Sequence, residues 1–317
     1  MNTSAPVHLS RRLVVVLLGL SAVFLWAYWP SLVEVVRRWS VDPTYSHGYF
    51  VPVLAALILW ARRDRLDPGR LKASWWGLGL VVCGTAVRLA SAYFAVYSPD
   101  RFSMILVLAG LCIGLGGWHA FRWAWPGIAF LLFMIPLPAG FDRLLAAPLQ
   151  RITTVVSANV LQTLGFVAEP EGNVLLLGRG DLGVVEACSG LRMFITFCAL
   201  ATALAVLGRR SLAQRLVIVA SAFPLAIICN VARITATGVV HETFGRGPAQ
   251  VIFHDVAGWL MIVLALILLL IEWKVLAHLF IPAEADASPP LLGQVRANRP
   301  QRTQHPAEAN TPVAASL

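Results

Sequence analysis

Charged residues are scarce in this chain, and their scarcity excludes most soluble folds. Only 13% of the 317 residues are charged, whereas 58% are hydrophobic. A soluble domain carries roughly a quarter charged residues. The mean hydropathy is +0.74, and the apolar residues come in runs of about 20, the length that spans a bilayer as a helix. The short alternating segments of a transmembrane β-barrel are missing, so the sequence predicts an all-α polytopic membrane protein.

Cysteines at C-x-x-C spacing are also missing. No two cysteines form a C-x-x-C motif, which leaves a zinc site or a redox dithiol unsupported. The five cysteines are Cys83, Cys112, Cys188, Cys198 and Cys229. Four of them lie in apolar runs, as small buried hydrophobic residues do, and only Cys188 has polar neighbours. We therefore expect no metal and no other cofactor.

Acidic residues are outnumbered, 16 against 25 Lys and Arg, which gives a net charge of +9. A basic chain can bind nucleic acid, but here the basic residues collect in loops between apolar runs. Cytoplasmic loops of membrane proteins have this excess of Lys and Arg. The expected partner is therefore the lipid bilayer, and no nucleic acid.

We predict eight membrane spans. Their approximate bounds are 13–30, 48–61, 75–97, 102–117, 120–136, 189–207, 213–230 and 255–280. With eight spans, the basic clusters all fall on one side, which we take as cytoplasmic. These clusters contain Arg11, Arg12, Arg62, Arg63, Arg65, Arg70, Lys72, Arg209, Arg210, Arg215 and Lys274. Both termini are then cytoplasmic.

The domain organisation follows from these spans. Residues 1–12 are the cytoplasmic N-terminus, 13–282 the transmembrane domain and 283–317 a cytoplasmic tail. The tail is rich in Ala, Pro, Gln, Asn and Arg, a composition that favours disorder. A basic start and an apolar run resemble a signal peptide, but no small-x-small cleavage site leads into a soluble domain. We therefore expect a retained signal anchor.

The longest segment between spans lies on the outer side. Residues 141–165 place apolar side chains at helical spacing, which predicts a helix in the interface, with a re-entrant helix as the alternative. Residues 173–177 and 182–185 are short apolar runs around a Gly-rich turn, a pattern typical of a β-hairpin. The second strand would bring Glu186 and Cys188 to the membrane surface.

A thiol, a carboxylate and a guanidinium stand together where the sixth span begins, in Glu186-Ala187-Cys188-Ser189-Gly190-Leu191-Arg192. Charged groups beside hydrocarbon are costly and commonly functional. Cys188 and Arg192 are four residues apart, on one helix face. A cation or a helix N-terminus lowers the pKa of a thiol from about 8.5. Cys188 is therefore a candidate nucleophile, with a packing cysteine as the alternative.

Polar groups also mark the outer ends of the last two spans. Arg233 lies at the end of the seventh span, either as an oxyanion donor or as an arginine that snorkels to headgroups. Asn230, on the same face, would orient it or donate a second hydrogen bond. His254 precedes the eighth span, as a proton shuttle or an interfacial histidine. His241 competes for this role, but it sits in a Gly/Arg loop.

Two further features are polar groups beside or inside spans. Tyr45-Ser46-His47-Gly48 opens the second span and either caps it or contacts substrate. Arg88 lies inside the third span, where it needs a partner or a watery cavity. The sequence alone does not name that partner.

These stretches resemble the exosortase/archaeosortase family of membrane transpeptidases. The resemblance covers about residues 25–280 and rests on Tyr45–Gly48, Ile135–Pro138, Val184–Arg192, Asn230–Ile234 and His254. It implies that Cys188 is the nucleophile, Arg233 the oxyanion stabiliser and His254 the general acid/base. The supporting residues would be Glu186, Arg192, Asn230, Tyr45 and His47.

The resemblance also implies a function. The protein would be a thiol protease and transpeptidase, multi-pass in the bacterial inner membrane, with its site at the periplasmic side. It would cleave membrane-anchored substrates at a C-terminal sorting signal of the Pro-Glu-Pro type or a related one, and pass the thioester to an acceptor. Two alternatives stay open: a hydrolytic cysteine protease, and a solute transporter or channel without catalysis. No inverted repeat supports the transporter.

Overall fold

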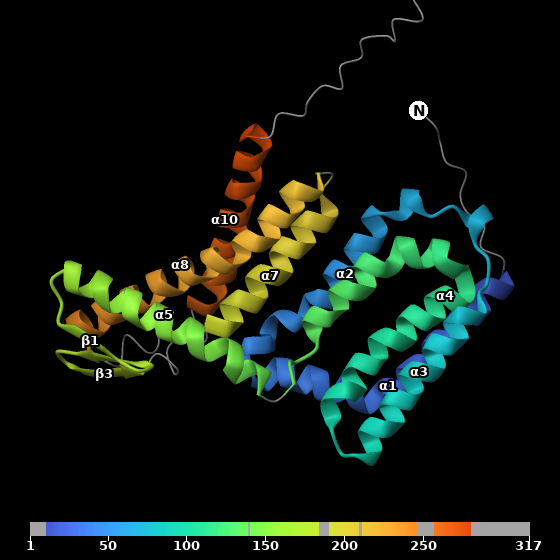
Figure 1. Cartoon of the computed structure of the whole chain (residues 1–317), viewed down its shortest axis with the longest axis horizontal. Coiled ribbons are helices and arrows are strands. Elements are labelled where there is room, and N and C mark those ends of the chain that lie inside the picture. The colour runs from blue at the N-terminus through green and yellow to red at the C-terminus, as the bar shows by residue number, and fades with distance from the viewer. Residues whose placement is uncertain (1–10, 139, 184–189, 209–210, 246–256, 280–317) are drawn as a thin grey trace, which may run out of the picture. The chain divides into compact units, whose positions relative to one another are not determined.

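The computed structural model describes residues 11–138, 140–183, 190–208, 211–245 and 257–279, and this part is mainly helical (Figure 1). The α-helices are α1 (Arg11–Val41), α2 (Val51–Ala61), α3 (Trp75–Tyr93), α4 (Tyr97–Phe130), α5 (Phe141–Thr163), α7 (Gly190–Leu207), α8 (Leu212–Phe244) and α10 (Ala257–Leu279). Short 3-10 helices are η1 (Pro43–Tyr49), η2 (Arg63–Arg65), η3 (Pro68–Arg70) and η4 (Leu131–Met134). By contacts the chain divides into Met1–Leu276 and Ala277–Leu317.

Among the described residues, seven helical stretches are long and apolar enough to cross a membrane. They are Val14–Val41, Pro43–Ala61, Trp75–Tyr93, Tyr97–Met134, Leu144–Thr163, Gly190–Leu207 and Leu212–Phe244. α10 has 23 residues, which is also the length of a span, although several of its side chains lie outside the described part. The predicted all-α polytopic membrane protein is confirmed.

The fourth and fifth predicted spans are the two halves of α4. The helix is broken at Gly117, where φ is 69° and ψ is −165°, and Figure 1 shows α4 turning there. A Cβ atom at Gly117 would lie 2.2 Å from the carbonyl oxygen of Lys72. Only glycine fits both the backbone conformation and this approach.

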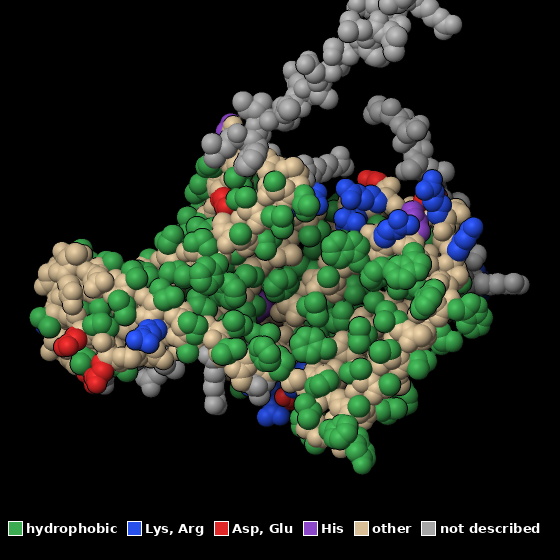
Figure 2. Space-filling view, in the orientation of Figure 1, with side chains coloured by type: hydrophobic (Ala, Val, Ile, Leu, Met, Phe, Trp, Pro, Cys, Tyr) green, Lys and Arg blue, Asp and Glu red, His purple; other side chains and the backbone are tan. Residues whose placement is uncertain are grey.

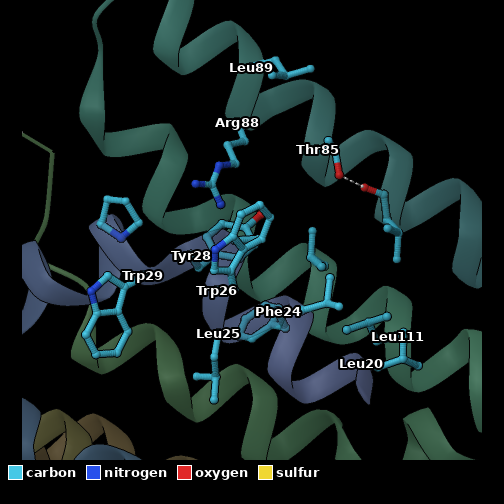
Figure 3. Close-up of a pocket in the computed structure, with 15 residues that line it drawn as sticks. Leu20, Phe24, Leu25, Trp26, Tyr28, Trp29, Thr85, Arg88, Leu89 and Leu111 are labelled. Atoms are coloured by element: carbon cyan, nitrogen blue, oxygen red, sulfur yellow. Dashed lines mark hydrogen bonds between the residues drawn. The ribbon is translucent and has the colours of Figure 1, made fainter. Parts of the chain in front are cut away.

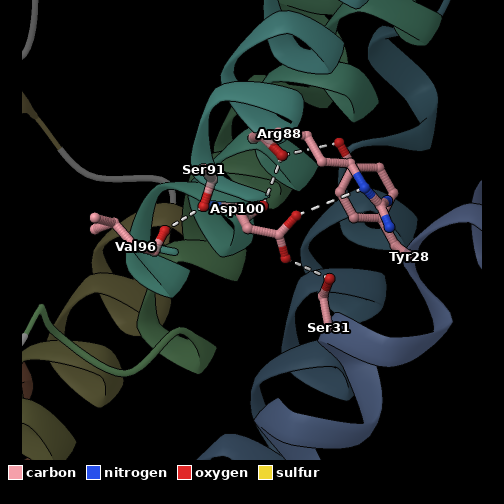
Figure 4. A network of polar contacts seen from close by, with 7 residues as sticks. Tyr28, Ser31, Arg88, Ser91, Val96 and Asp100 are labelled. Carbon is pink, nitrogen blue, oxygen red and sulfur yellow. Dashed lines mark hydrogen bonds and ion pairs between the residues drawn. The ribbon is translucent and has the colours of Figure 1, made fainter. Parts of the chain in front are cut away.

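Arg88 has its partners in a polar cluster between α1, α3 and α4 (Figure 4). Its Nε lies 3.6 Å from Oδ1 of Asp100, and its guanidinium stacks 4.3 Å from the ring centroid of Tyr28. Ser31 donates a hydrogen bond to Oδ2 of Asp100 at 2.5 Å. The hydroxyls of Tyr28 and Ser103 are 2.9 Å apart. A charge inside a span is thus paired and hydrogen-bonded, as its cost requires.

A small sheet follows α5. It contains β1 (Ala168–Glu171), β2 (Val174–Leu177) and β3 (Gly180–Gly183) in the order β1-β2-β3, and both pairs are antiparallel. The predicted hairpin is β2–β3. The register pairs Leu177 with Gly180 and leaves a two-residue turn. β1 was not predicted, because only one residue of its Ala-Glu-Pro-Glu sequence is buried.

The sheet packs against two helices, as Figure 1 shows. Ala168, Leu175 and Leu177 from the sheet form one apolar cluster with Leu161 of α5 and Ile234 of α8. The helix expected over 141–165 is α5, and its length and composition are those of a possible span. Its place relative to the membrane, interfacial or re-entrant, stays a prediction.

Candidate functional site

Only part of the predicted site lies among the described residues. Glu186, Cys188 and His254 are outside them. The distances that join Cys188, Arg233 and His254 therefore stay a prediction. The predicted residues within the described part are Tyr45, His47, Arg192, Asn230 and Arg233.

Arg233 lies inside α8, and the predicted end of the seventh span at residue 230 is wrong. α8 continues to Phe244 and stops at Gly245, where φ is 88°. No proline interrupts this extension, so the helix does not end where the purely apolar run ends. Arg233 is only 3% exposed. This burial argues against the snorkelling alternative, because a snorkelling arginine keeps its charged head in the headgroup layer.

Asn230 joins three helices. Its Nδ2 donates to the hydroxyl of Thr153 on α5 at 3.3 Å, and that hydroxyl donates to the carbonyl of Leu149 at 2.9 Å. A Cβ atom at Gly190, the first residue of α7, would lie 3.1 Å from Nδ2 of Asn230. Asn230 is 1% exposed, and its Oδ1 is buried without a hydrogen-bond partner in the described part of the chain. Its amide oxygen is thus a buried hydrogen-bond acceptor that the described residues leave unused.

The hairpin is attached to the same helix. The backbone N–H of Arg179, in the β2–β3 turn, donates to Oε1 of Glu242 at 3.0 Å. Nη1 of Arg179 donates to the carbonyl of Thr243 at 3.2 Å. The chain on one side of residues 184–189 is therefore held at the end of α8, and Gly190 on the other side packs against Asn230. Both flanks of the segment that contains Cys188 are anchored on the helix that carries Arg233.

A polar stripe, defined as Asn230, Arg233, Thr237 and His241, follows the buried face of α8. Thr237 donates to the carbonyl of Arg233 at 2.8 Å, so its hydroxyl is satisfied within the helix. His241 was expected in a loop, and this is wrong, because it lies in α8 and is 1% exposed. Eight residues separate it from Arg233, a rise of about 12 Å, so it lies well away from that guanidinium.

Tyr45 and His47 fasten η1 to the segment after α4. The backbone N–H of Leu137 donates to the hydroxyl of Tyr45 at 3.1 Å, and Nε2 of His47 lies 3.1 Å from the carbonyl oxygen of Phe133. Both side chains are buried. Each thus has a structural task, and contact with substrate stays a prediction.

His47 also lines a small apolar cavity. The cavity has a volume of about 230 Å³ and lies between η1, α2 and α7, with Thr196 on its α7 wall. Arg192 is one helical turn before Thr196, so the two residues share a face of α7. The face of α7 that carries Arg192 and Thr196 therefore points toward η1.

One group of basic residues lies at the end of α2 that is opposite to η1. Figure 2 shows Lys and Arg side chains over the turns that join α2 to α3. Arg62 donates to the carbonyls of Trp123 and Arg122, each at 3.2 Å. Burial lowers the pKa of Arg62, and the nearby charges of Arg65 and Arg215 lower it further. Two basic clusters that are far apart in the sequence therefore meet.

The remaining cysteines are Cys83, Cys112, Cys198 and Cys229, and all four are free. The expectation that they are buried is wrong for Cys83, which is exposed, and Cys112 is only half-buried. Cys229 is buried, and Cys198 packs against the same apolar cluster of α7, α8 and α10. Their surroundings are apolar. This agrees with the interpretation of these two as packing residues.

Sequence reasoning missed two residues at the Asn230 junction, Thr153 and Gly190. Thr153 is fully buried, yet in the sequence it is one of many polar residues of an amphipathic helix. Gly190 was read as part of a motif and not as a contact. A glycine at the start of a span could have indicated this contact, because the missing side chain lets a neighbouring residue approach the backbone closely.

One of the comparisons with known proteins finds a family match. The family model described as transmembrane exosortase matches residues 39–271, which include every candidate site residue from Tyr45 to His254. The comparisons with curated proteins and with solved structures find no match.

Proposed function

Because the chain belongs to the transmembrane exosortase family, we propose that it is a membrane-embedded cysteine transpeptidase. Its substrates are exported proteins that carry a C-terminal sorting signal: a short motif of the Pro-Glu-Pro type or a related one, a transmembrane helix and a basic cluster. The substrate is cut at the motif and its new carboxyl end is transferred to an acceptor.

Three residues perform the chemistry in this proposal. The thiolate of Cys188 attacks the carbonyl carbon at the sorting motif, and a carbon–sulfur bond forms. The guanidinium of Arg233 donates hydrogen bonds to the oxyanion. The carbon–nitrogen bond then breaks, and the leaving amine takes a proton from His254. A thioester on Cys188 remains until the acceptor's nucleophile displaces the sulfur.

One observation supports this assignment most directly. Arg233 is buried on α8, and the described chain on both sides of residues 184–189 is held by α8, at Glu242 and at Asn230. A buried guanidinium is a stronger electrostatic donor than an exposed one, because the surroundings screen it less. Asn230 supports this arrangement by fixing α5 and the start of α7 one turn from Arg233.

We place the site at the outer face of the bacterial inner membrane. The support is the clustering of Arg62, Arg65 and Arg215 at one end of the helices. An excess of Lys and Arg is typical of the cytoplasmic side. Because α2 runs from η1 to Arg62, η1 is at the opposite end, which would face the periplasm.

Water and another nucleophile compete for the same thioester. A hydrolytic protease would release a free acid, whereas a transpeptidase would release a product joined to its acceptor. The burial of Arg233 favours transfer, because a site that excludes water protects a reactive intermediate. The transporter alternative is not required by Arg88, since its pairing with Asp100 gives this charge a structural role.

The experiment that tests this function is co-expression with an exported protein that ends in a sorting signal. Mass spectrometry of the processed C-terminus gives the site of cleavage and the mass added there. We expect a truncated product whose mass exceeds that of the free acid. The Cys188→Ala protein should leave the signal intact, whereas the matched Cys198→Ala protein should process it. A signal that is cut normally by Cys188→Ala would refute the thiol mechanism.

A further inference from the structure

A groove lies between α1, α3 and α4 (Figure 3). Its volume is about 1040 Å³. The walls come from α1 between Leu20 and Pro30, from α3 between Val81 and Leu89, and from α4. The side chains that line it are apolar except for Thr85 and Arg88. The groove is thus suited to a ligand that has an apolar chain and a single polar group.

The guanidinium of Arg88 can bind more than it now holds. Asp100 faces its Nε at 3.6 Å, and the ring of Tyr28 covers one face. Nη1 is buried without a hydrogen-bond partner among the described residues. The hydroxyl of Thr85, by contrast, donates to the carbonyl of Val81 at 2.9 Å. Nη1 itself is buried, but the Arg88 side chain is 25% exposed and lines the groove, so the accessible part of its guanidinium can meet an acceptor, most simply an anionic one.

Positive charge is in excess where α1 ends beyond the groove. Glu34 is shared by two guanidiniums: Arg101 approaches it at 3.8 Å and Arg37 at 3.9 Å. The Arg37 side chain is 75% exposed, so its charge is open to the surroundings. Together with the spare donor of Arg88, this surplus is complementary to an anion at this end of the groove.

We propose that the groove binds an anionic phospholipid. The phosphate accepts hydrogen bonds from the Arg88 guanidinium, and an acyl chain lies along α1. The distance from Leu20 to Tyr28 along the helix is about 12 Å, which accommodates an extended stretch of acyl chain. An apolar helix of a substrate would fill the groove without offering an acceptor to the Arg88 guanidinium. The α1 wall also precedes residue 39, where the family match begins.

Photo-crosslinking in vesicles tests this proposal. The protein is reconstituted in phosphatidylcholine vesicles that contain a trace of phosphatidylglycerol with a photoactivatable acyl chain, and crosslinked peptides are mapped. A parallel set carries the same label on phosphatidylcholine. We expect phosphatidylglycerol to label α1 between Leu20 and Pro30 in preference to phosphatidylcholine. Arg88→Gln should reduce that labelling about tenfold, as the loss of one charge-assisted hydrogen bond does.

Two matched variants separate binding from folding. Arg63 stacks on Trp60 at 4.4 Å, much as Arg88 stacks on Tyr28, but outside the groove. Arg63→Gln should therefore leave labelling unchanged. Thr85→Trp retains the Arg88–Asp100 pair while filling the groove, so the thermal midpoint should be kept and labelling by both lipids should fall.

Three results would overturn the proposal. The first is equal labelling of α1 by the two lipids. The second is wild-type labelling of a folded Arg88→Gln protein. The third is displacement of the lipid label by a peptide with the apolar helix of a sorting signal, which would make the groove a substrate site.

Discussion

Gly190→Ala probes the contact that brings the start of α7 to Asn230. The new Cβ would lie 3.1 Å from Nδ2 of Asn230 and 3.8 Å from Cβ of Leu149, where ordinary contacts are 3.4–4 Å. Asn230 is buried and held by Thr153. Either Asn230 or the start of α7 must therefore move by a few tenths of an ångström.

The energies of this substitution partly offset each other. Alanine in place of glycine favours a helix by up to about 1 kcal/mol, and less at its first residue. Overpacking a well-filled site costs about 1–3 kcal/mol. We expect a net loss of stability of about 1–2 kcal/mol or less. Catalysis depends more steeply on position, and a shift of about 1 Å can cost about 100-fold in rate. A shift of a few tenths of an ångström should therefore reduce processing several-fold, by about 4-fold or more.

The assay is processing of a sorting-signal substrate at equal membrane abundance, together with thermal unfolding in detergent. Gly79→Ala is the matched control, because Gly79 is also helical and its Cβ would meet nothing within 4 Å. This control should process normally and keep its stability. Normal processing by a folded Gly190→Ala protein would show that the contact of α7 with Asn230 does not position the site.

Three other predictions concern separate features. Arg233→Lys should be nearly as damaging as Arg233→Ala, about 100- to 1000-fold in rate, because lysine lacks the planar fork that directs the donors; near-normal processing by the lysine variant would show that charge suffices. Reporter fusions at Arg65 and Arg210 should report the cytoplasm and one at Arg179 the periplasm, and a cytoplasmic signal at Arg179 would reverse the proposed orientation. Asp100→Ala should destabilise the protein by about 1–3 kcal/mol. This is less than the loss expected for a fully buried ion pair, because the side chains of Arg88 and Asp100 are 25% and 21% exposed. An unchanged denaturation curve would mean that the polar cluster does not contribute to stability.

Apolar runs predicted most of the helices, because a bilayer requires long apolar segments whatever the tertiary packing. The apolar runs did not predict the end of α8, because Arg233 and His241 interrupt the run before the helix ends. Polar side chains do not stop a helix whose buried face receives them, and hydropathy does not report which neighbours face that helix. α8 ends only at Gly245, where the backbone has a positive φ.

The sequence also did not predict which side chains on different helices contact each other. Arg88 was recognised as a charge that needs a partner, but Asp100 was not identified, because the pairing depends on how the α3–α4 turn folds back. Thr153 was likewise invisible as the partner of Asn230. The sequence does supply the identities of Cys188, Arg233 and His254 as candidates, since each stands out as a reactive or charged group beside an apolar run. Their convergence is a tertiary property.

The acyl-enzyme is the most direct test of the central claim. The protein is incubated with a substrate that carries the sorting signal, quenched in acid, digested and mapped by mass spectrometry. The account predicts that the N-terminal part of the substrate is attached to Cys188 through a bond that hydroxylamine cleaves, with release of the C-terminal fragment. If the C-terminal fragment is released and no adduct on Cys188 is detected at any time, even during the first turnover, the result would contradict the account.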